Sequence, residues 1–360
     1  MPAKNLFDKP FDEGTRIKLG IYKEYFREWL PVFVAKKNPI WKAVQIFDFF
    51  AGRGKDKNAE FGSPLIAIDV IQSLNNHIVQ NNIKVTLHLN ELDGDSYNAL
   101  IENVSGLNTD FEIKTYNKHF QAVFDEHYNS MKNSANFLFL DQNGIKEITN
   151  DIFQKITSLK QTDFLFFISS SYFKRFATTT EFQKYFPFDP KEVESIDYYH
   201  IHRKVLNHYK SLIPSNKKYF LAPFSIKKGA NIYGLIFGTN HTLGIEKFLS
   251  VAWKKDTLRG EANYDIDNEK INIKTPSLFE QYDKPNKRQV FEKNLADYIL
   301  NNYFKTNYDV YLFGLNEGFL LKDVNTVLKN LKTDKKIDFD FTLISSDLHK
   351  LENIQSIKLL

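Results

Sequence analysis

The segment FDFFAGRG, residues 47–54, has the residue types of a loop that closes around a ligand. Glycine lacks a Cβ, so two glycines in one turn let the backbone approach a bound molecule closely. Asp48 stands late in the apolar run before the turn, where its carboxylate could receive an ammonium group, directly or through water. A tight turn without any ligand is the alternative. The residues predicted to approach the ligand are Phe50, Ala51, Gly52 and Gly54.

A second segment, NELDGDSYNAL at residues 90–100, follows the next apolar run. An acidic residue at the end of the second strand of a Rossmann-type sheet hydrogen-bonds ribose hydroxyls. Glu91 is predicted to do so, and Leu92 beside it to contact the same ligand. A solvated carboxylate is the alternative for Glu91 alone. Two such segments at the expected distance favour a bound nucleotide-type ligand.

The third segment is NFLFLDQNG, residues 136–144, in which Asp141 ends a buried apolar run. Open α/β sheets place their chemistry at the carboxyl edge, so Asp141 is the candidate catalytic residue. It could orient an acceptor nucleophile or touch the cofactor; a loop-capping role is the alternative. Together the three segments favour S-adenosylmethionine over a dinucleotide. Amino-methyltransferases of DNA carry N/D-P-P-Y/F here, and D-Q-N-G departs from it, so a base methyltransferase is not predicted.

These segments need a scaffold in which strands and helices alternate. A wide apolar face predicts a helix over residues 15–37 that lies on a sheet. Alternation then predicts a doubly wound parallel sheet, with two later strands pairing antiparallel at its edge. The expected strands are 44–50, 85–89, 111–116, 137–140, 164–168, 218–225 and 232–238, and the expected helices between and after them are 63–74, 96–104, 120–131, 148–159, 198–212 and 243–254.

The C-terminal part has a different pattern. Residues 257–287 are polar and predict a linker or peripheral excursion between a domain over 1–256 and another over 288–360. Helical patterns at 289–303 and 322–331, a short run at 310–313 and a β-like run at 337–344 predict a small winged-helix-like domain. Its lysines could hold phosphates; a solvated helix face and a protein-docking module are the alternatives. These lysines are Lys322, Lys329, Lys332, Lys335 and Lys336.

Composition excludes several classes of protein. The 360 residues include no cysteine, so disulfides, thiolate metal sites and cysteine nucleophiles are absent. His200 and His202 are two apart and would not share a helix face, so no metal site is expected, and His241 is expected to serve a turn. Apolar runs are too short to cross a membrane, and a polar, acidic N-terminus gives no signal peptide. The net charge of +4 neither demands nor excludes nucleic acid, and a cytoplasmic protein is expected.

Read together, these blocks resemble the three-Cys-motif partner proteins, the TcmP family. The segments that carry the resemblance are the helix KLGIYKEYFREWLPVF, FDFFAGRG with GSPLIAIDV, NELDGDSYNAL, LDQNG in place of the family's D-P-F-G, and YGLIFGTNHTLGIEKFLSVAW. They cover most of the chain. Gln142 and Asn143 replace a proline and an aromatic residue of the family pattern, which bears on catalysis more than on cofactor binding.

The resemblance implies a class I methyltransferase-like domain that binds S-adenosylmethionine. It also implies a partner, a three-cysteine iron–sulfur protein similar to radical-S-adenosylmethionine enzymes, encoded beside it in bacterial mobile or defence-type islands. Three functions stay open at this stage. The first is a methyltransferase, with nucleic acid among its conceivable acceptors. The second is an inactive Rossmann scaffold that binds protein or nucleic acid, and the third, weakest, is a nuclease or another nucleotide enzyme, which lacks clustered carboxylates for two metals.

Overall fold

The computed structural model describes residues 9–142, 147–176, 179, 183, 197–229, 231–269 and 285–360. The chain forms two compact units, Met1–Asn240 and His241–Leu360. The N-terminal unit holds all three segments that the sequence marks as a possible site. The sequence predicts a domain boundary at residue 256, which differs from the division after Asn240 and stays a prediction.

The N-terminal unit is built on a seven-stranded sheet in the part of the chain described, with the order β3-β2-β1-β4-β5-β7-β6. All neighbours up to β5 are parallel, whereas β7 runs antiparallel to both β5 and β6. The doubly wound sheet with an antiparallel edge is therefore confirmed. The strands are β1 (Ala43–Asp48), β2 (Lys84–Asn90), β3 (Glu112–Tyr116), β4 (Ala135–Leu140), β5 (Thr162–Ser169), β6 (Phe220–Lys228) and β7 (Asn231–Thr239).

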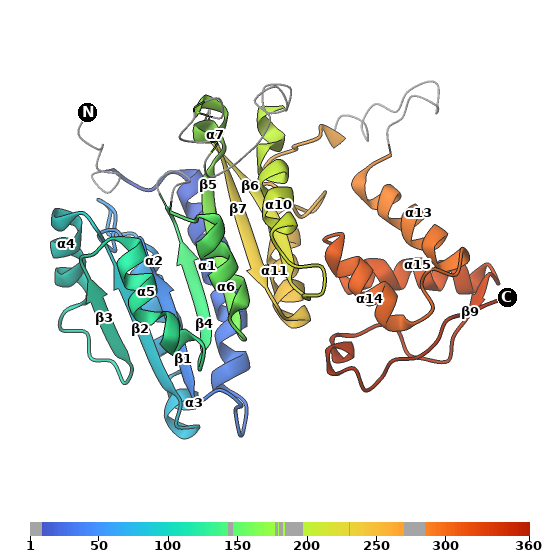
Figure 1. Cartoon of the computed structure of the whole chain (residues 1–360), viewed down its shortest axis with the longest axis horizontal. Coiled ribbons are helices and arrows are strands. Elements are labelled where there is room, and N and C mark those ends of the chain that lie inside the picture. Colours follow the sequence, from blue (N-terminus) through green and yellow to red (C-terminus); the bar gives the residue numbers. More distant parts are fainter. Residues whose placement is uncertain are drawn as a thin grey trace. The chain divides into compact units, whose positions relative to one another are not determined.

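Helices cover both faces of this sheet (Figure 1). The alternation of side chains along β4 shows the division, because successive residues of a strand point to opposite faces. Leu138 and Leu140 belong to the apolar core shared with α5 (Phe120–Met131), α6 (Asn150–Ser158) and α10 (Ile201–Ser211). Phe137 stacks instead on Phe26 of α1 (Glu13–Val34), with ring centroids 5.3 Å apart. Both faces of the central strands are consequently buried.

Helix α1 is fixed to the sheet by polar contacts as well as by its aromatic face. Asp12 caps its N-terminus by accepting a hydrogen bond from the Thr15 amide at 2.9 Å. The buried Tyr25 hydroxyl donates to Asp163 on β5, and Thr239 at the end of β7 donates to the other oxygen of that carboxylate at 2.6 Å. The Tyr25 contact anchors the middle of α1 to the start of β5, and the first turns of α1 reach the carboxyl edge, where Lys18 pairs with Asp141.

The other helices of this unit agree with the predicted pattern, with two short additions over residues 75–80 and 170–176. The predicted helix at 63–74 is α2 (Ser63–Gln72), with Gly62 at its N-cap and Pro64 in its first turn, and it is followed by a short, unpredicted α3 (Asn75–Gln80). A 3-10 turn, η2 (Tyr198–His200), precedes α10. The remaining described helices here are α4 (Gly94–Val104) and α7 (Ser170–Phe176). No helix among the described residues is long and apolar enough to span a membrane.

The C-terminal unit is mainly helical. It contains α11 (Thr242–Lys255), α13 (Lys287–Leu300), α14 (Asn307–Asn316), α15 (Leu321–Thr333) and the 3-10 turn η4 (Ser346–Lys350). The β-like run expected over 337–344 is wrong in length. Only β8 (Ile337–Asp338) pairs, with β9 (Lys358–Leu359), and the apolar side chains beyond it pack as irregular chain. Of the lysines considered for phosphate binding, Lys332 pairs with Asp338 at 2.9 Å and Lys336 with Asp334 at 3.6 Å.

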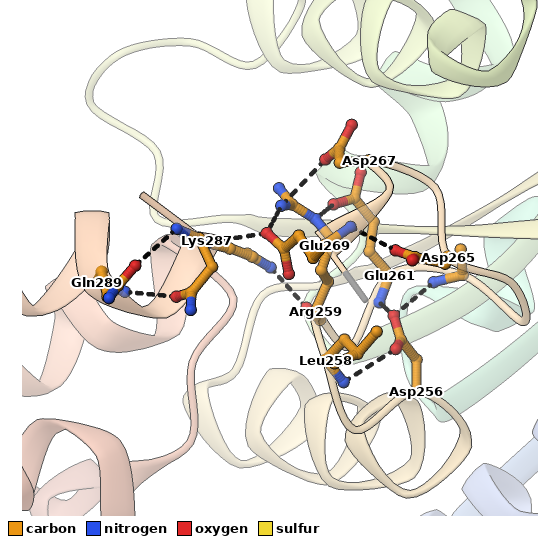
Figure 2. A network of polar contacts seen from close by, with 11 residues as sticks. Asp256, Leu258, Arg259, Glu261, Asp265, Asp267, Glu269, Lys287 and Gln289 are labelled. Carbon is orange, nitrogen blue, oxygen red and sulfur yellow. Dashed lines mark hydrogen bonds and ion pairs between the residues drawn. The ribbon is translucent and has the colours of Figure 1, made fainter. Parts of the chain in front are cut away.

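The polar segment after α11 contains an ordered network around Arg259 (Figure 2). The guanidinium contacts Glu269 and lies 3.0 Å from an Asp267 oxygen and 3.6 Å from a Glu261 oxygen. Lys287, at the start of α13, donates its side chain to the Arg259 carbonyl at 2.8 Å. Ion pairs therefore hold residues 259–269 together, and hydrogen bonds from Lys287 join this segment to the start of α13. Residues 270–284 of that linker lie outside the described residues.

Candidate active site

A cavity of about 480 Å³ lies at the carboxyl edge of the sheet in the N-terminal unit. Open α/β sheets bind ligands at this edge. Its walls come from the segments after β1 and β4, the N-terminus of α2, the end of β5, the first turns of α1 and the β6–β7 hairpin. Among the residues that line it are Thr15, Lys18, Phe50, Ala51, Ser63, Asp141, Gln142, Phe167, Lys228 and Tyr233.

The glycine loop after β1 takes the conformation that its composition predicts. Gly52 and Gly54 have φ of 63° and 86°, in the left-handed region that favours glycine. The loop then folds back, and the Gly62 amide donates to the Gly54 carbonyl at 2.8 Å. A Cβ on Gly62 would lie 3.1 Å from that carbonyl oxygen, so any other residue would crowd this close approach. The loop thereby brings the N-terminus of α2 to the cavity.

Glu91 joins this loop to the end of β2. One carboxylate oxygen accepts the Gly52 amide at 2.8 Å, and the other accepts the Asp93 amide at 2.9 Å. Each carboxylate oxygen has two lone pairs, so both can accept a further hydrogen bond. Leu92 follows with 52% of its surface exposed, and Asn117 fixes its carbonyl at 2.9 Å. The carboxylate is therefore oriented by two backbone amides and retains acceptor capacity.

Asp48, the last residue of β1, is almost wholly buried. Its Oδ1 accepts the Phe50 amide at 3.3 Å, and its Oδ2 has no hydrogen-bond partner among the described residues. Burial raises the pKa of Asp48 to about 7; the charges of Asp141 and Glu91 act in the same direction, against the Ser63 hydroxyl and the Phe50 amide. A buried carboxylate oxygen without a donor is costly, so this atom is suited to receive a cation or a water-mediated contact.

Asp141 lies at the end of β4, in the cavity wall, and forms an ion pair with Lys18 of α1. Lys18 also lies over the Phe167 ring of β5, 5.2 Å from its centroid. The side chains of Lys18 and Asp141 keep 20% and 28% of their surface exposed, so both reach the cavity space. The predicted catalytic carboxylate thus has a cationic partner from a helix far away in sequence.

Gln142, the second residue of D-Q-N-G, has a structural role. Its amide nitrogen donates to the Phe167 carbonyl at 3.3 Å, and its amide oxygen accepts the Glu147 amide at 3.1 Å. The buried Gln142 side chain therefore ties the end of β4 to β5 and to the return of its own loop. Asn143 and Gly144, the rest of D-Q-N-G, lie outside the described residues.

A second lysine–aspartate pair stands on the wall formed by α1 and the hairpin. Lys228, at the end of β6, lies 2.8 Å from an Asp12 oxygen and 3.4 Å from the Thr15 hydroxyl. Its ammonium is 5.8 Å from the centroid of the Tyr233 ring. A Cβ on Gly14 would lie 2.8 Å from the Lys228 Cβ, so helix and strand approach closely here.

The structure brings only some of the predicted residues to the cavity wall. Phe50, Ala51 and Asp141 line it, whereas the other five belong to the adjoining loops and strand ends. Lys18, Lys228 and Tyr233 also line the cavity and were not predicted from the sequence. One sequence feature could have indicated Lys18. It is a cation four residues before the buried Tyr22, so it lies on the apolar face of the helix, where a charged residue is unusual. The predicted residues outside the wall are Asp48, Gly52, Gly54, Glu91 and Leu92.

His241 caps α11 by accepting the Leu243 amide at 3.1 Å, which is the turn role expected for it.

No protein-family model matches the chain, and no curated protein sequence matches it.

Two solved structures illustrate the similarities that were found. Trm1 from Pyrococcus horikoshii, determined as a complex with S-adenosyl-L-methionine, is 11% identical over 66% of this chain, with a TM-score of 0.33. The match spans 58% of Trm1. TrmK from M. capricolum, in complex with S-adenosyl-homocysteine, is 12% identical over 88% of this chain and 96% of its own, with a TM-score of 0.28. Both scores are low, so no argument about activity rests on them. The strand order and the antiparallel β7 give the N-terminal unit the Rossmann-like fold of class I methyltransferases.

Proposed function

We propose that the N-terminal unit binds S-adenosylmethionine and transfers its methyl group to an acceptor. One observation carries this proposal. Glu91 is held by the Gly52 and Asp93 amides beside a glycine loop that opens onto a cavity at the carboxyl edge. A ribose-binding carboxylate next to such a loop is what a nucleoside-containing cofactor needs.

The residues present fit this cofactor at two further points. The unpartnered Asp48 Oδ2 offers a buried negative charge to the cofactor's ammonium group, directly or through water. The left-handed glycines leave room for the backbone to lie against the ligand. Phe50 and Ala51 would then contact the ligand from the cavity wall, and Leu92 would cover it beyond Glu91.

When bound, the cofactor supplies an electrophilic methyl group. The chain's own contribution is positioning, because methyl transfer needs the acceptor atom in line with the methyl carbon and its leaving sulfur. Glu91 and Asp48 would hold the two ends of the cofactor. Asp141, on the neighbouring strand end, would orient the acceptor.

Calorimetry with S-adenosylmethionine tests the proposal. Binding is expected to the wild type and to Glu102→Ala, which removes an exposed carboxylate of α4. Glu91→Ala should bind about ten-fold or more weakly, because it removes two acceptor oxygens and releases the Gly52 amide. Absence of binding to the folded wild type would overturn the proposal.

A scaffold that binds the cofactor without transferring its methyl group is the second candidate. The ion pair of Asp141 with Lys18 favours it, since it engages the carboxylate proposed to orient the acceptor. Binding without turnover on nucleic-acid and protein pools would support this candidate. Turnover on any such pool would exclude it.

Three finer proposals remain from the sequence: membership of the TcmP family, an iron–sulfur partner of bacterial mobile or defence-type systems, and nucleic-acid contact by a winged-helix-like C-terminal unit. The described lysines give the last only modest support, because Lys332 and Lys336 are paired with carboxylates. Co-purification with the product of a neighbouring three-cysteine gene tests the first two proposals. Retardation of labelled nucleic acid tests the third.

A further inference from the structure

The Lys18–Asp141 pair presents a hydrogen-bond donor and an acceptor side by side on the cavity wall. Among the described residues, Lys18 is the hydrogen-bond partner of the Asp141 carboxylate and contacts one of its two oxygens, Oδ2. The Oδ1 atom can therefore accept a hydrogen bond from a ligand. The ammonium of Lys18 has three N–H groups and gives one to Asp141, so it can donate another while the pair stays intact.

The charged side chains that line the cavity balance one another. Lys18 pairs with Asp141 and Lys228 with Asp12, so these four groups carry no net formal charge. The wall also includes the aromatic side chains of Phe50, Phe167 and Tyr233. Aromatic walls with balanced charge suit a flat, uncharged ring more than an anionic group such as a phosphate.

We propose that the methyl acceptor is an uncharged heteroaromatic ring whose exocyclic amino group neighbours a ring nitrogen, as in adenine and cytosine. The amino N–H donates to Asp141 Oδ1, and the ring nitrogen accepts from Lys18. The inference rests on the proposed function, of which it names the substrate class. The D-Q-N-G sequence gives no indication of it, because the donor comes from α1.

Asp141 and Lys18 have different roles in the methyl transfer. The amino nitrogen forms a bond to the methyl carbon while the carbon–sulfur bond breaks, and the electron pair of that bond stays on the sulfur. The nitrogen then releases one proton, which Asp141 accepts. Lys18 acts as a positioning residue, since it holds the ring and the Asp141 carboxylate but does not touch the reacting atoms.

Binding of free nucleosides to the full chain saturated with S-adenosylhomocysteine tests this geometry. Saturation keeps adenosine out of the cofactor position. Adenosine or cytidine should bind about ten-fold or more tightly than inosine or uridine, which replace the amino group and the acceptor nitrogen by a carbonyl and an N–H. Adenosine 5′-monophosphate should bind no better than adenosine.

Two variants test the residues, and the readout is the ratio of cytidine to uridine affinity. Lys18→Met should reduce this ratio to near one while cofactor affinity is kept, and Asp141→Ala should do the same. The matched control is Lys23→Met on the same helix. The Lys23 ammonium lies 3.2 Å from an Asp69 oxygen, and neither residue lines the cavity, so this variant should keep the ratio.

Equal binding of amino and carbonyl nucleosides, binding of the monophosphate alone, or no nucleoside binding by cofactor-saturated protein would each overturn the inference. If the protein fails to bind the cofactor at all, the proposed function fails. The ratio of cytidine to uridine affinity is then measured without cofactor. A ratio that is retained in the wild type and lost in Lys18→Met would still support recognition of the ring by Lys18 and Asp141. The two failures are therefore distinguishable.

Discussion

Three carboxylates stand at the ends of three adjacent strands, and their surroundings separate their roles. Glu91 is oriented by two backbone amides, Asp141 by a lysine, and Asp48 is buried with one oxygen unpartnered. Only the last arrangement costs the protein stability in the absence of a ligand, because charge is buried without full compensation. Such a conflict is typical of a functional position.

Asp48→Asn is expected to stabilise the ligand-free protein, and more so at pH 8 than at pH 5. The folded pKa of about 7 lies above the ordinary value, so folding favours the protonated form. The contribution of Asp48 is fully present below pH 3.8 and falls as pH rises through 7, because the buried group must then ionise. The gain from the substitution should be about 2–3 kcal/mol larger at pH 8 than at pH 5. Urea unfolding at both pH values measures it.

The same variant should bind S-adenosylmethionine more weakly, since the amide offers no negative charge to the ammonium. Asp110→Asn, at an exposed loop position, serves as the control and should leave both quantities unchanged. A variant that is less stable at pH 8 than the wild type would show that the Asp48 carboxylate is compensated by contacts other than those described here.

At the scale of elements, periodicity predicted most of the scaffold but not its contacts. The apolar face of α1 marks a helix that lies on a sheet, and alternation along the chain marks the parallel strands. Which strand α1 crosses depends on the packing of Tyr22 and Phe26 against Phe137, which lies more than a hundred positions later in the sequence. The partnership of Lys18 with Asp141 follows from that crossing and so was not available from local patterns. The strand predicted over residues 337–344 is only two residues long, because a strand needs a partner to pair with and β9 offers only two residues.

Tyr25→Phe tests how firmly α1 is attached to the sheet. The substitution removes one side-chain donor to the buried Asp163 and leaves Thr239. Burial raises the pKa of Asp163 to about 6, against hydrogen bonds from Thr239 and Tyr25, so the group is charged at pH 8 and largely neutral at pH 5. We expect a loss of about 1–3 kcal/mol at pH 8 and a smaller loss at pH 5. Guanidinium unfolding measures both, with the exposed Tyr303→Phe as control; equal losses at the two pH values would contradict this reasoning.

At the scale of the whole molecule, the proposed chemistry and the polar network around Arg259 belong to different units. All residues predicted or inferred for the site lie before residue 241. The second unit is held by helix packing and by a guanidinium that faces three carboxylates (Figure 2). Disrupting that network should therefore lower the stability of the C-terminal unit and leave the site in the N-terminal unit unchanged.

Arg259→Met is expected to destabilise the C-terminal unit while leaving cofactor affinity unchanged. Methionine keeps much of the apolar stem but leaves Glu261, Asp267 and Glu269 without the guanidinium, and two of these carboxylates are more than 90% buried. Removing one partner of a buried charge cluster costs about 3–5 kcal/mol. Hydrogen exchange should accelerate in peptides from 241–269 and 285–360 but not in the sheet, and the exposed Lys329→Met should change neither. A more than about three-fold loss of cofactor affinity, roughly 0.6 kcal/mol, would instead show that the second unit shapes the site.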